Sequence, residues 1–435
     1  MRTLDWAKLG DAGRRGALAR PALSRPETVS AGVAETIAAV RAGGDAALRS
    51  LTRRFDKVDL KVFKVSPREF RSAEAQMPPA DLAALKESVR RVTLFHQEQR
   101  PKPYAIETSR GVRCERRFVP LGAVGLYVPG GSAPLPSTVI MLGVPARLAG
   151  CPVKVIATPP RRDGSVHPAI LTAARLVGLT DIYKVGGAQA IAALAYGTES
   201  VPKADKIFGP GNPWVTEAKL QVSRDPQGAA CDFPAGPSEV LVIADAVADP
   251  VFVAADLLAQ AEHGPDSQVL LVSDSPRLLA AAAAELRRQL PLLRRAAIAR
   301  AALAGSRFIR VSTIAEACAV SERYAPEHLI IHVARPRRWL KRIANAGSVF
   351  LGPWSPESVG DYAAGPNHCL PTYGYARAYG GLCVESFMKS LTVTELNPRG
   401  LRAIGPVVER LAGLEGLGAH KAAVTLRLAR LGGRA

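Results

Sequence analysis

Apolar residues along this chain follow two alternating spacings, one typical of buried strands and one typical of helices. Between residues 121 and 237, short apolar runs alternate with longer stretches of helical periodicity. The strand-like runs are GAVGLYVP, VKVIATP, DIYKVG and DKIFGPG. The helical stretches are PSTVIMLGVPARLAG, HPAILTAARLVG and GAQAIAALAYG. This alternation predicts a parallel sheet covered by helices.

The same alternation returns after residue 237. Further strands are predicted for SEVLVIAD, SQVLLVSD, SRFIRVS, HLIIHV and AGSVFLG, and helices for DPVFVAADLLAQAEH and SPRLLAAAAAELRRQL. We therefore expect an α/β fold with two units of similar design. The segment before residue 120 is predicted to be mainly helical, except for KVDLKVFKVSPREF. The tail after about residue 381 is also predicted to be helical.

Neither unit carries the glycine fingerprint GxGxxG of a standard dinucleotide site. The nearest pieces are Gly186-Gly187 and Gly209-Pro210-Gly211, which lack the third glycine and the downstream acid. An α/β unit can still bind a nucleotide without this motif, so the sequence pattern alone leaves that question open.

The length of 435 residues predicts more than one domain. The net charge of +19 raises the possibility of nucleic-acid binding. However, the basic residues are spread over the whole chain, and the densest cluster, between Arg335 and Arg342, is typical of one solvated helix start. No RNP, zinc-finger or helix-turn-helix pattern accompanies the charge, so we expect no nucleic-acid partner.

Other features indicate a cytoplasmic protein. The first twenty residues show no apolar core of a secretory signal. The longest uncharged stretch, from Phe118 to Ala146, is interrupted by prolines and glycines, unlike a membrane helix. The six cysteines form no CxxC pair, which favours reduced thiols. Cys114 and Cys151 are candidates for a nucleophile that traps an aldehyde, but neither has an activating partner nearby in sequence.

The most informative segment is AADLLAQAEHGPD, at residues 254 to 266. It reads as the end of an apolar helix that places Gln260 and His263 three residues apart, hence on one face. An amide oxygen and an imidazole nitrogen in that arrangement could bind one metal ion. The alternative is an ordinary amphipathic helix with a polar end.

Three further segments carry polar groups in loops rich in glycine and proline, where sites are commonly built. Glu327 and His328 arrive together at a strand entrance, although a helix-capping pair is the alternative. Asp361 and His368 lie in GDYAAGPNHCLPT, where Asp361 could instead be a turn or N-cap residue. His420 follows Glu415 in EGLGAH and could be a plain helix residue. Together these groups predict a metal site with an acid–base pair.

The remaining histidines are interpreted as structural or peripheral. His96 in TLFHQEQR and His167 before a proline are predicted to lie on the surface, and His332, which alternates with apolar residues, in a strand interior.

Long, ordered motifs give the chain a family resemblance from about residue 25 to its C-terminus. They include GLYVPGGSAPLPSTVIMLGVPA, VGGAQAIAALAYGTESVPKADKIFGPGN, FPAGPSEVLVIAD, DLLAQAEHGPDSQ, YAPEHL, GDYAAGPNHCLPT and EGLGAHKAAVTLR. On these motifs the chain closely resembles the histidinol dehydrogenase family. The resemblance implies a zinc-dependent oxidation of L-histidinol through L-histidinaldehyde to L-histidine with two NAD, the last step of histidine biosynthesis.

Carried over position by position, the resemblance implies a role for each site residue. The implied zinc ligands are Gln260, His263, Asp361 and His420. The implied proton-transfer pair is Glu327 and His328. The implied NAD contacts are Tyr127, Gln189 and Asn212. The substrate contacts would be Ser238, Glu415, His328 and the zinc ligands, and His368 would support the site from behind.

The resemblance also implies a fold and an assembly. We expect two incomplete Rossmann-like domains with parallel sheets, a helical N-terminal segment at 1–25 and a helical tail at 381–435. Residues 121–237 would bind NAD, and a discontinuous domain of 26–120 and 238–380 would carry the metal and acid–base residues. Members of this family are dimers whose tails cross to the partner, so Glu415 and His420 are expected to complete the neighbour's site.

Two other functions remain open from the sequence. A relative with the same metal site could act on another small alcohol, such as a sulfopropanediol, and substrate recognition near Ser238 and Glu415 would distinguish it. A catalytically silent basic protein that binds nucleic acid is the other, and steep salt dependence of binding would reveal it.

Overall fold

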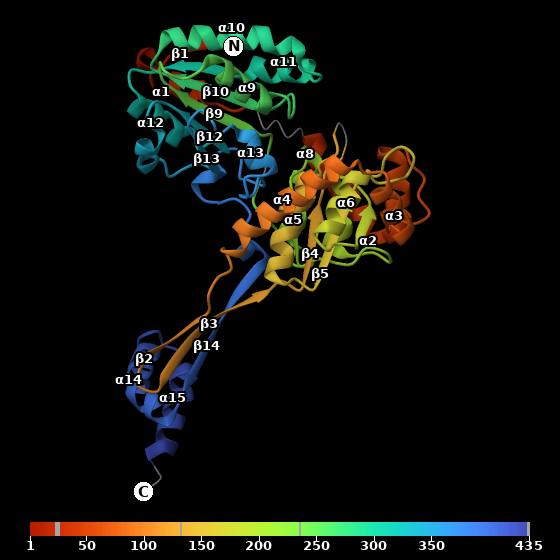
Figure 1. Cartoon of the computed structure of the whole chain (residues 1–435). Coiled ribbons are helices and arrows are strands. Elements are labelled where there is room, and N and C mark those ends of the chain that lie inside the picture. Colours follow the sequence, from red (N-terminus) through yellow and green to blue (C-terminus); the bar gives the residue numbers. More distant parts are fainter. Residues whose placement is uncertain (22–26, 131–132, 235, 433–435) are drawn as a thin grey trace.

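The computed structural model describes residues 1–21, 27–130, 133–234 and 236–432. Figure 1 shows two α/β units side by side. A third part, which we call the arm, consists of residues 104–120 and 388–432 and carries the C-terminus away from both units. The expected α/β class with two parallel sheets is confirmed. Within the described residues, no helix is both long and apolar enough to cross a membrane.

The first unit is a five-stranded parallel sheet. Its strands, in spatial order, are β6 (Ile182–Lys184), β5 (Val153–Thr158), β4 (Ala123–Tyr127), β7 (Lys206–Phe208) and β8 (Ala230–Cys231). One face is covered by α5 (Pro136–Ala149) and α6 (Pro168–Leu176), and the other by α7 (Gly187–Tyr196) and α8 (Pro213–Arg224). The strands and helices predicted between residues 121 and 237 are all present, because their buried apolar runs give an unambiguous local signal.

The second unit is a six-stranded parallel sheet of the same design. Its spatial order is β1 (Arg2–Asp5), β11 (Arg307–Arg310), β10 (Gln268–Ser273), β9 (Glu239–Ala244), β12 (His328–His332) and β13 (Ser348–Leu351). One face is covered by α9 (Pro250–Ala261), α10 (Pro276–Gln289) and α11 (Ala296–Gly305), and the other by α1 (Asp11–Ala17) and α12 (Ile314–Tyr324).

Both sheets reverse their strand order at one point. In the first sheet the chain runs outward from β4 through β5 to β6 and then returns to β7 on the other side of β4. The second sheet repeats this path, with the reversal between β9 and β12. Such a point leaves a crevice in which α/β proteins commonly bind ligands.

The helices before residue 100 belong with the first unit. They are α2 (Glu27–Phe55), α3 (Pro67–Ala75) and α4 (Pro79–Gln97). Their apolar faces join the two cores of the five-stranded sheet, where α2 packs on α7 and α8 and α4 packs on α5. This grouping differs from the expected division, in which 26–120 accompanied 238–380. The expected boundary at residue 25 lies outside the described residues.

The N-terminal segment begins with strand β1, which the sequence did not predict. Only Leu4 of this short strand packs on a core, so four residues gave no periodic signal. The strand forms because its backbone pairs in parallel with the distant edge strand β11.

Two further predictions were wrong, because parts of the arm that were predicted to be helical are strands. Residues before 120 include strands β2 (Tyr104–Ser109) and β3 (Val112–Pro120), and the tail, predicted to be helical, contains strand β14 (Met388–Leu396). These three strands form an antiparallel sheet in which β14 pairs with β3 along its whole length. Pairing between segments nearly 300 residues apart is invisible to local periodicity. The helices α14 (Pro398–Leu414) and α15 (Gly418–Gly432) then form a hairpin, as expected for the rest of the tail.

Short elements complete the described chain. They are α13 (Glu357–Tyr362), the two-residue strand β8, and 3₁₀ turns at Trp6–Lys8, Leu290–Leu292, Pro336–Arg342, Tyr375–Arg377 and Val384–Phe387. The basic cluster between Arg335 and Arg342 is exposed except for partial burial near Pro336 and Trp339, consistent with a solvated turn.

The prediction for His96 was wrong. Its side chain is fully buried, with Nδ1 2.9 Å from the Val92 carbonyl and Nε2 3.3 Å from the Asn367 amide. Burial lowers the pKa of this imidazole. The polar residues around it in sequence suggested a surface position, but α4 turns this one face toward the segment at 367–369. His332 is buried within β12, as predicted.

Candidate active site at the junction of the two sheets

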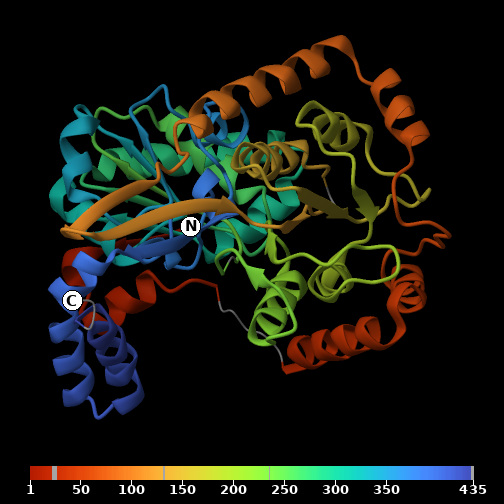
Figure 2. The same cartoon turned by 90° about the horizontal axis from the view of Figure 1, so that it is seen from below.

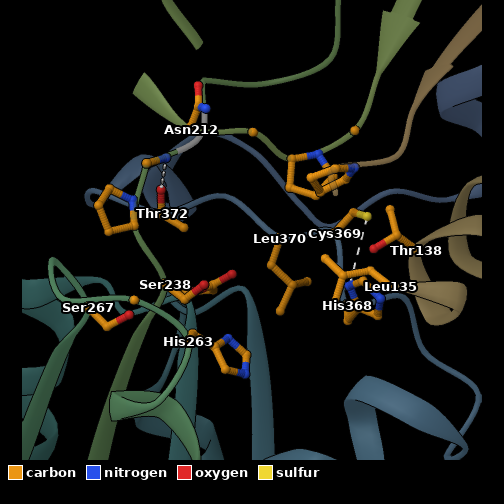
Figure 3. A pocket seen from close by; sticks show the side chains of 18 of the residues that line it. Leu135, Thr138, Asn212, Ser238, His263, Ser267, His368, Cys369, Leu370 and Thr372 are labelled. Atoms are coloured by element: carbon orange, nitrogen blue, oxygen red, sulfur yellow. Dashed lines mark hydrogen bonds between the residues drawn. The ribbon is translucent and has the colours of Figure 1, made fainter. Parts of the chain in front are cut away.

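A cavity of about 540 Å³ lies between the two α/β units, and we call it the junction cavity. From the five-stranded sheet it is lined by loops that follow β4 and β7, at the carboxyl edge of that sheet. From the six-stranded sheet it is lined by residues that precede or begin β9, β10 and β12, at the amino edge. Figure 3 shows side chains of both units around the space between them, with Asn212 on one side and Ser238 and His263 on the other.

Gln260 and His263 lie at the end of α9, and their predicted proximity is confirmed. The orientation of the Gln260 amide that satisfies its neighbours has Oε1 3.2 Å from Nδ1 of His263. The amide nitrogen then donates to Glu357 Oε1 at 3.0 Å and to the Glu239 carbonyl at 3.1 Å. Gln260 is fully buried, whereas the imidazole of His263 is partly exposed in the cavity wall. The amide oxygen and the imidazole therefore share one side of the helix end.

Asp361 lies opposite His263 on the short helix α13. Its Oδ2 is 3.9 Å from His263 Nε2, and its Oδ1 is 3.8 Å from His328 Nε2. Burial raises the pKa of Asp361 to about 7. Asp361 is neither a turn residue nor an N-cap, because it lies within α13 and lines the cavity.

Glu357 is a site residue that sequence reasoning missed. It is buried, and its carboxylate lies with the imidazole of His263 and the carboxylate of Asp361 in a group whose ligand atoms are all within 4.8 Å of one another. Burial, followed by the charges of Asp361 and Glu327, raises its pKa well above the usual value. The spacing of four residues between Glu357 and Asp361 on one helix could have revealed it.

Glu327 and His328 stand at the entrance of β12, as predicted, and do not cap a helix. The Glu327 carboxylate accepts a hydrogen bond from the backbone N–H of Glu239 at 2.8 Å and lies 3.6 Å from His328 Nδ1. The same Nδ1 is 3.2 Å from the carbonyl of Glu239. Nε2 is thus the ring nitrogen nearer Asp361. Both side chains line the junction cavity.

Burial shifts the pKa values of both Glu327 and His328 away from their ordinary range. It raises the pKa of Glu327 well above that of an ordinary carboxyl group, and the negative charges of Glu239 and Asp361 add to this effect. It lowers the pKa of His328 to about 3, so the imidazole is neutral at neutral pH. Perturbed acids and bases facing one cavity are typical of catalytic sites.

Glu239 connects the pair to the rest of the fold. Its carboxylate accepts two hydrogen bonds from Arg20, at 2.6 and 2.8 Å, and one from the backbone N–H of Tyr373. The Arg20 guanidinium also stacks 4.0 Å from the centre of the Tyr324 ring. Since the backbone of Glu239 contacts both Glu327 and His328, this ion pair supports the start of β9 directly beside them.

We expect Arg20→Met to lower the free energy of unfolding by about 3 kcal/mol, because it leaves the buried Glu239 carboxylate without its cation. Arg53→Met is the matched control. Arg53 pairs with Asp59 at 2.8 Å, but both side chains are 65% exposed, and such pairs contribute under about 1 kcal/mol. Urea denaturation of the two variants measures the difference. Equal stabilities for both would show that the Arg20–Glu239 pair does not support the fold.

Ser238, His368 and Cys369 complete the wall of the junction cavity (Figure 3). The Nε2 of His368 is buried without a hydrogen-bond partner, and burial lowers its pKa to about 4. Burial raises the pKa of the Cys369 thiol, which disfavours a thiolate nucleophile. Cys151 is buried with a raised pKa, and neither it nor Cys114 lines the cavity.

A second cavity of about 750 Å³ lies along the carboxyl edge of the five-stranded sheet, and we call it the sheet-edge cavity. All three residues expected to contact NAD line it. The hydroxyl of Tyr127 accepts from the N–H of Gly187 at 3.1 Å, Gln189 is buried at the start of α7, and Asn212 caps α8 by accepting from Val215 at 3.1 Å. Burial raises the pKa of Tyr127 to about 12. The two cavities meet at shared residues, namely Gly130, Ala133 and Asn212.

Glu415 and His420 are the two expected site residues that the chain does not bring to this place. Both are exposed on the helical hairpin of the arm, and neither lines the junction cavity. Figures 1 and 2 show that the hairpin projects away from both sheets. The chain therefore brings together Gln260, His263 and Asp361 without the fourth expected ligand.

Comparison with known proteins gives a consistent result. The family model "Histidinol dehydrogenase" matches residues 19–428. The chain is 56% identical over 428 residues to the histidinol dehydrogenase of Xanthomonas axonopodis pv. citri (strain 306), covering 98% of this chain and 99% of that protein. It is 51% identical to that of Vibrio parahaemolyticus serotype O3:K6 (strain RIMD 2210633) over 431 residues, 99% of both. The crystal structure of histidinol dehydrogenase from Elizabethkingia anophelis superposes with a TM-score of 0.95 at 44% identity, covering 99% of each chain.

Proposed function

This chain belongs to the histidinol dehydrogenase family, and we propose that it oxidises L-histidinol through L-histidinaldehyde to L-histidine with two NAD, the last step of histidine biosynthesis. The observation that supports the proposal most directly is the junction cavity. One wall offers oxygen and nitrogen donors for a cation, and beside them lie a buried neutral imidazole and a buried carboxyl group. These are the groups that an alcohol oxidation followed by hydration of an aldehyde requires.

The donor set fits a zinc ion. Gln260, His263 and Asp361 would hold it, with oxygen and nitrogen ligands of the kind zinc accepts. Glu357 and Asp256 lie behind them, and burial raises the pKa of both, to about 7 for Asp256. A cation would offset this concentration of buried acids. Zinc bound there would orient the imidazole and amino nitrogens of the substrate.

His328 would accept the proton of the substrate hydroxyl in the first oxidation. In the tautomer whose Nδ1–H donates to the Glu239 carbonyl, Nε2 would keep a free lone pair, and the lowered pKa keeps the ring neutral. Glu327 would activate the water that adds to the aldehyde, because its raised pKa makes the ionised carboxylate a stronger proton acceptor. Ser238, also in the cavity wall, would contact the substrate.

The sheet-edge cavity would hold NAD, whose chemistry would supply the hydride acceptor for both oxidations. Tyr127, Gln189 and Asn212 line that cavity, which lies where the strand order reverses, the usual ligand position in such sheets. Because the two cavities share Asn212 and residues of the loop after β4, a cofactor held in one would adjoin a substrate held in the other. Residues 121–237 would thus act as the NAD-binding domain, and the six-stranded unit would carry the metal and acid–base residues.

We expect the purified protein to form two NADH for each L-histidinol consumed, with no free aldehyde released. Absorbance at the NADH band, together with the amount of L-histidine formed, measures this ratio. A ratio of one would show that the protein stops at the aldehyde. A protein that oxidises a sulfopropanediol but not histidinol would contradict the assigned substrate.

The exposed arm supports a homodimer in which the tails are exchanged. Helix α15 has no buried residue, and α14 buries only Gly400, Gly405 and Ala412. Several large apolar side chains of the arm are more than a third exposed; they are Tyr104, Ile106, Leu391, Leu396, Val407, Val408, Leu411, Leu414, Leu417 and Leu426. An apolar surface of this kind is typical of a protein interface. A second copy would cover it and would supply Glu415 for the substrate's ammonium group and His420 as the fourth zinc ligand.

We also propose that the enzyme acts in the cytoplasm. All six cysteines are free thiols, the usual state in a reducing compartment.

A further inference from the structure

The first unit lacks the acid that nucleotide-binding α/β units usually carry after their second strand. That strand is β5, which ends at Thr158 and continues into Pro159 and Pro160. In the standard arrangement a carboxylate at this place accepts hydrogen bonds from the ribose hydroxyls of the adenosine half of NAD. If NAD binds in the sheet-edge cavity, another residue has to do so.

Asp56 supplies a carboxylate to the same cavity from a different part of the chain. It directly follows α2, the helix that packs across α7 and α8, and it lines the sheet-edge cavity together with Thr158 and Tyr127. Its side chain is half-buried, and its Oδ2 is buried without a hydrogen-bond partner. The hydroxyl oxygen of Thr158, also in this wall, is likewise buried and unpartnered. Buried polar atoms normally have partners, so the unpartnered carboxylate oxygen of Asp56 leaves this cavity wall with the capacity to accept a hydrogen bond from a ligand.

The charge of Asp56 suits such a ligand. Burial raises the pKa of its carboxyl group to about 6, so it is ionised at neutral pH. An ionised carboxylate accepts hydrogen bonds and donates none. The two hydroxyls of a ribose can donate, so they are suitable partners for it. The exposed indole of Trp214 lines the same cavity and offers a flat apolar face to a base.

The position of Asp56 decides which half of the cofactor it meets. Asp56 lines the sheet-edge cavity only, whereas Glu327 and His328 line the junction cavity only. The nicotinamide must lie near the acid–base pair, so the far end, the adenosine, lies on the side of Asp56.

We propose that Asp56 recognises the adenosine ribose of NAD by accepting hydrogen bonds from its 2′ and 3′ hydroxyls, and that its charge excludes the 2′-phosphate of NADP. This inference rests on the proposed NAD-linked function. Arg161 and Arg162 line the same cavity and would attract a phosphate there. The negative charge of Asp56 opposes that attraction at the ribose, which makes it the determinant of preference between the two cofactors.

The test is Asp56→Asn compared with Asp59→Asn in the full-length, metal-loaded enzyme. Asp59 is three residues further along and exposed, paired only with Arg53 on the surface, so its variant makes the same charge change outside the cavity. We expect Asp56→Asn to raise the dissociation constant of NAD about tenfold, the usual effect of losing a charged hydrogen bond. The KM for NAD should rise similarly while kcat changes little. The ratio of kcat/KM for NADP over NAD should increase, and Asp59→Asn should change none of these.

Two measurements separate this inference from misfolding and from the proposed function. The pKa of Asp56 is raised by folding, so its ionised form destabilises the fold above about pH 6, and Asp56→Asn should melt no lower than wild type at pH 8. Asp56→Ala should weaken NAD binding in the same direction. Unchanged NAD affinity and unchanged cofactor preference in both variants would overturn the inference. The proposed function would still hold if these variants formed two NADH per histidinol at saturating NAD. Failure of wild type to form two NADH would instead overturn the function, and NAD titration without histidinol would still measure the role of Asp56.

Discussion

Replacing Glu327 or His328 should nearly abolish turnover without weakening NAD binding. For Glu327→Gln and His328→Gln we expect kcat to fall by a factor of about 10² to 10⁴, the usual contribution of a positioned acid or base. The two variants should differ in the step that fails. His328→Gln should slow the first oxidation, because the substrate hydroxyl loses its proton acceptor. Glu327→Gln should slow the second, because the water that adds to the aldehyde loses its base. Single-turnover measurements that start from histidinol or from histidinaldehyde distinguish the two.

His332→Gln is the matched control for the histidine. It is buried in the same strand, four residues beyond His328, but does not line the junction cavity. We expect it to alter stability while leaving kcat within a few-fold of wild type. If Glu327→Gln or His328→Gln retained more than about a tenth of wild-type kcat, the assignment of proton transfer to this pair would be wrong.

Two inactive variants should restore activity when they are mixed, if the tail completes the partner's site. Asp361→Ala and His420→Ala each remove one zinc ligand, and we expect each alone to retain less than about a hundredth of the activity. In a hybrid dimer with exchanged tails, one site would lack both ligands and the other would be intact. Random reassociation makes half of the dimers hybrid, so the mixture should recover about a quarter of wild-type activity.

The control for this experiment is a mixture of two variants whose changed residues belong to the same chain's site. Asp361→Ala mixed with His263→Ala should recover nothing, because both residues lie beside the same junction cavity. Zinc content should fall in each single variant and rise again in the mixture of Asp361→Ala and His420→Ala. If that mixture stayed inactive while its hybrid dimers were shown to form, His420 would not act across the dimer, and the exposed apolar arm would need another explanation.

Local sequence spacing was sufficient for much of the site. Gln260 and His263 come together because the turn that ends α9 bonds the N–H of His263 to the carbonyl of Gln260 at 3.2 Å, so a spacing of three residues places both side chains on one side. Glu327 and His328 reach the cavity because they are adjacent at a strand entrance. Long motifs then carried the family assignment, which the comparisons confirm.

Other features depend on contacts between distant segments. Glu357 has the helical spacing that relates it to Asp361, but its contact with Gln260 exists only because α13 packs beside α9. His96 lies in a polar stretch yet is buried, because one face of α4 meets a segment some 270 residues away. Asp56 follows an ordinary surface helix in the sequence, and only the packing of α2 on the first sheet brings it to the sheet-edge cavity.

Apolar periodicity was enough to predict the two α/β units, because each buried strand and amphipathic helix is encoded within its own segment. Spacing and motif also predicted most of the candidate site residues, although not Glu357 or Asp56. Long-range packing places the amino edge of one sheet against the carboxyl edge of the other and pairs β3 with β14 in the arm. It also leaves Glu415 and His420 outside the junction cavity of their own chain. These arrangements depend on contacts between segments hundreds of residues apart, and the local pattern of apolar residues carries no information about such contacts.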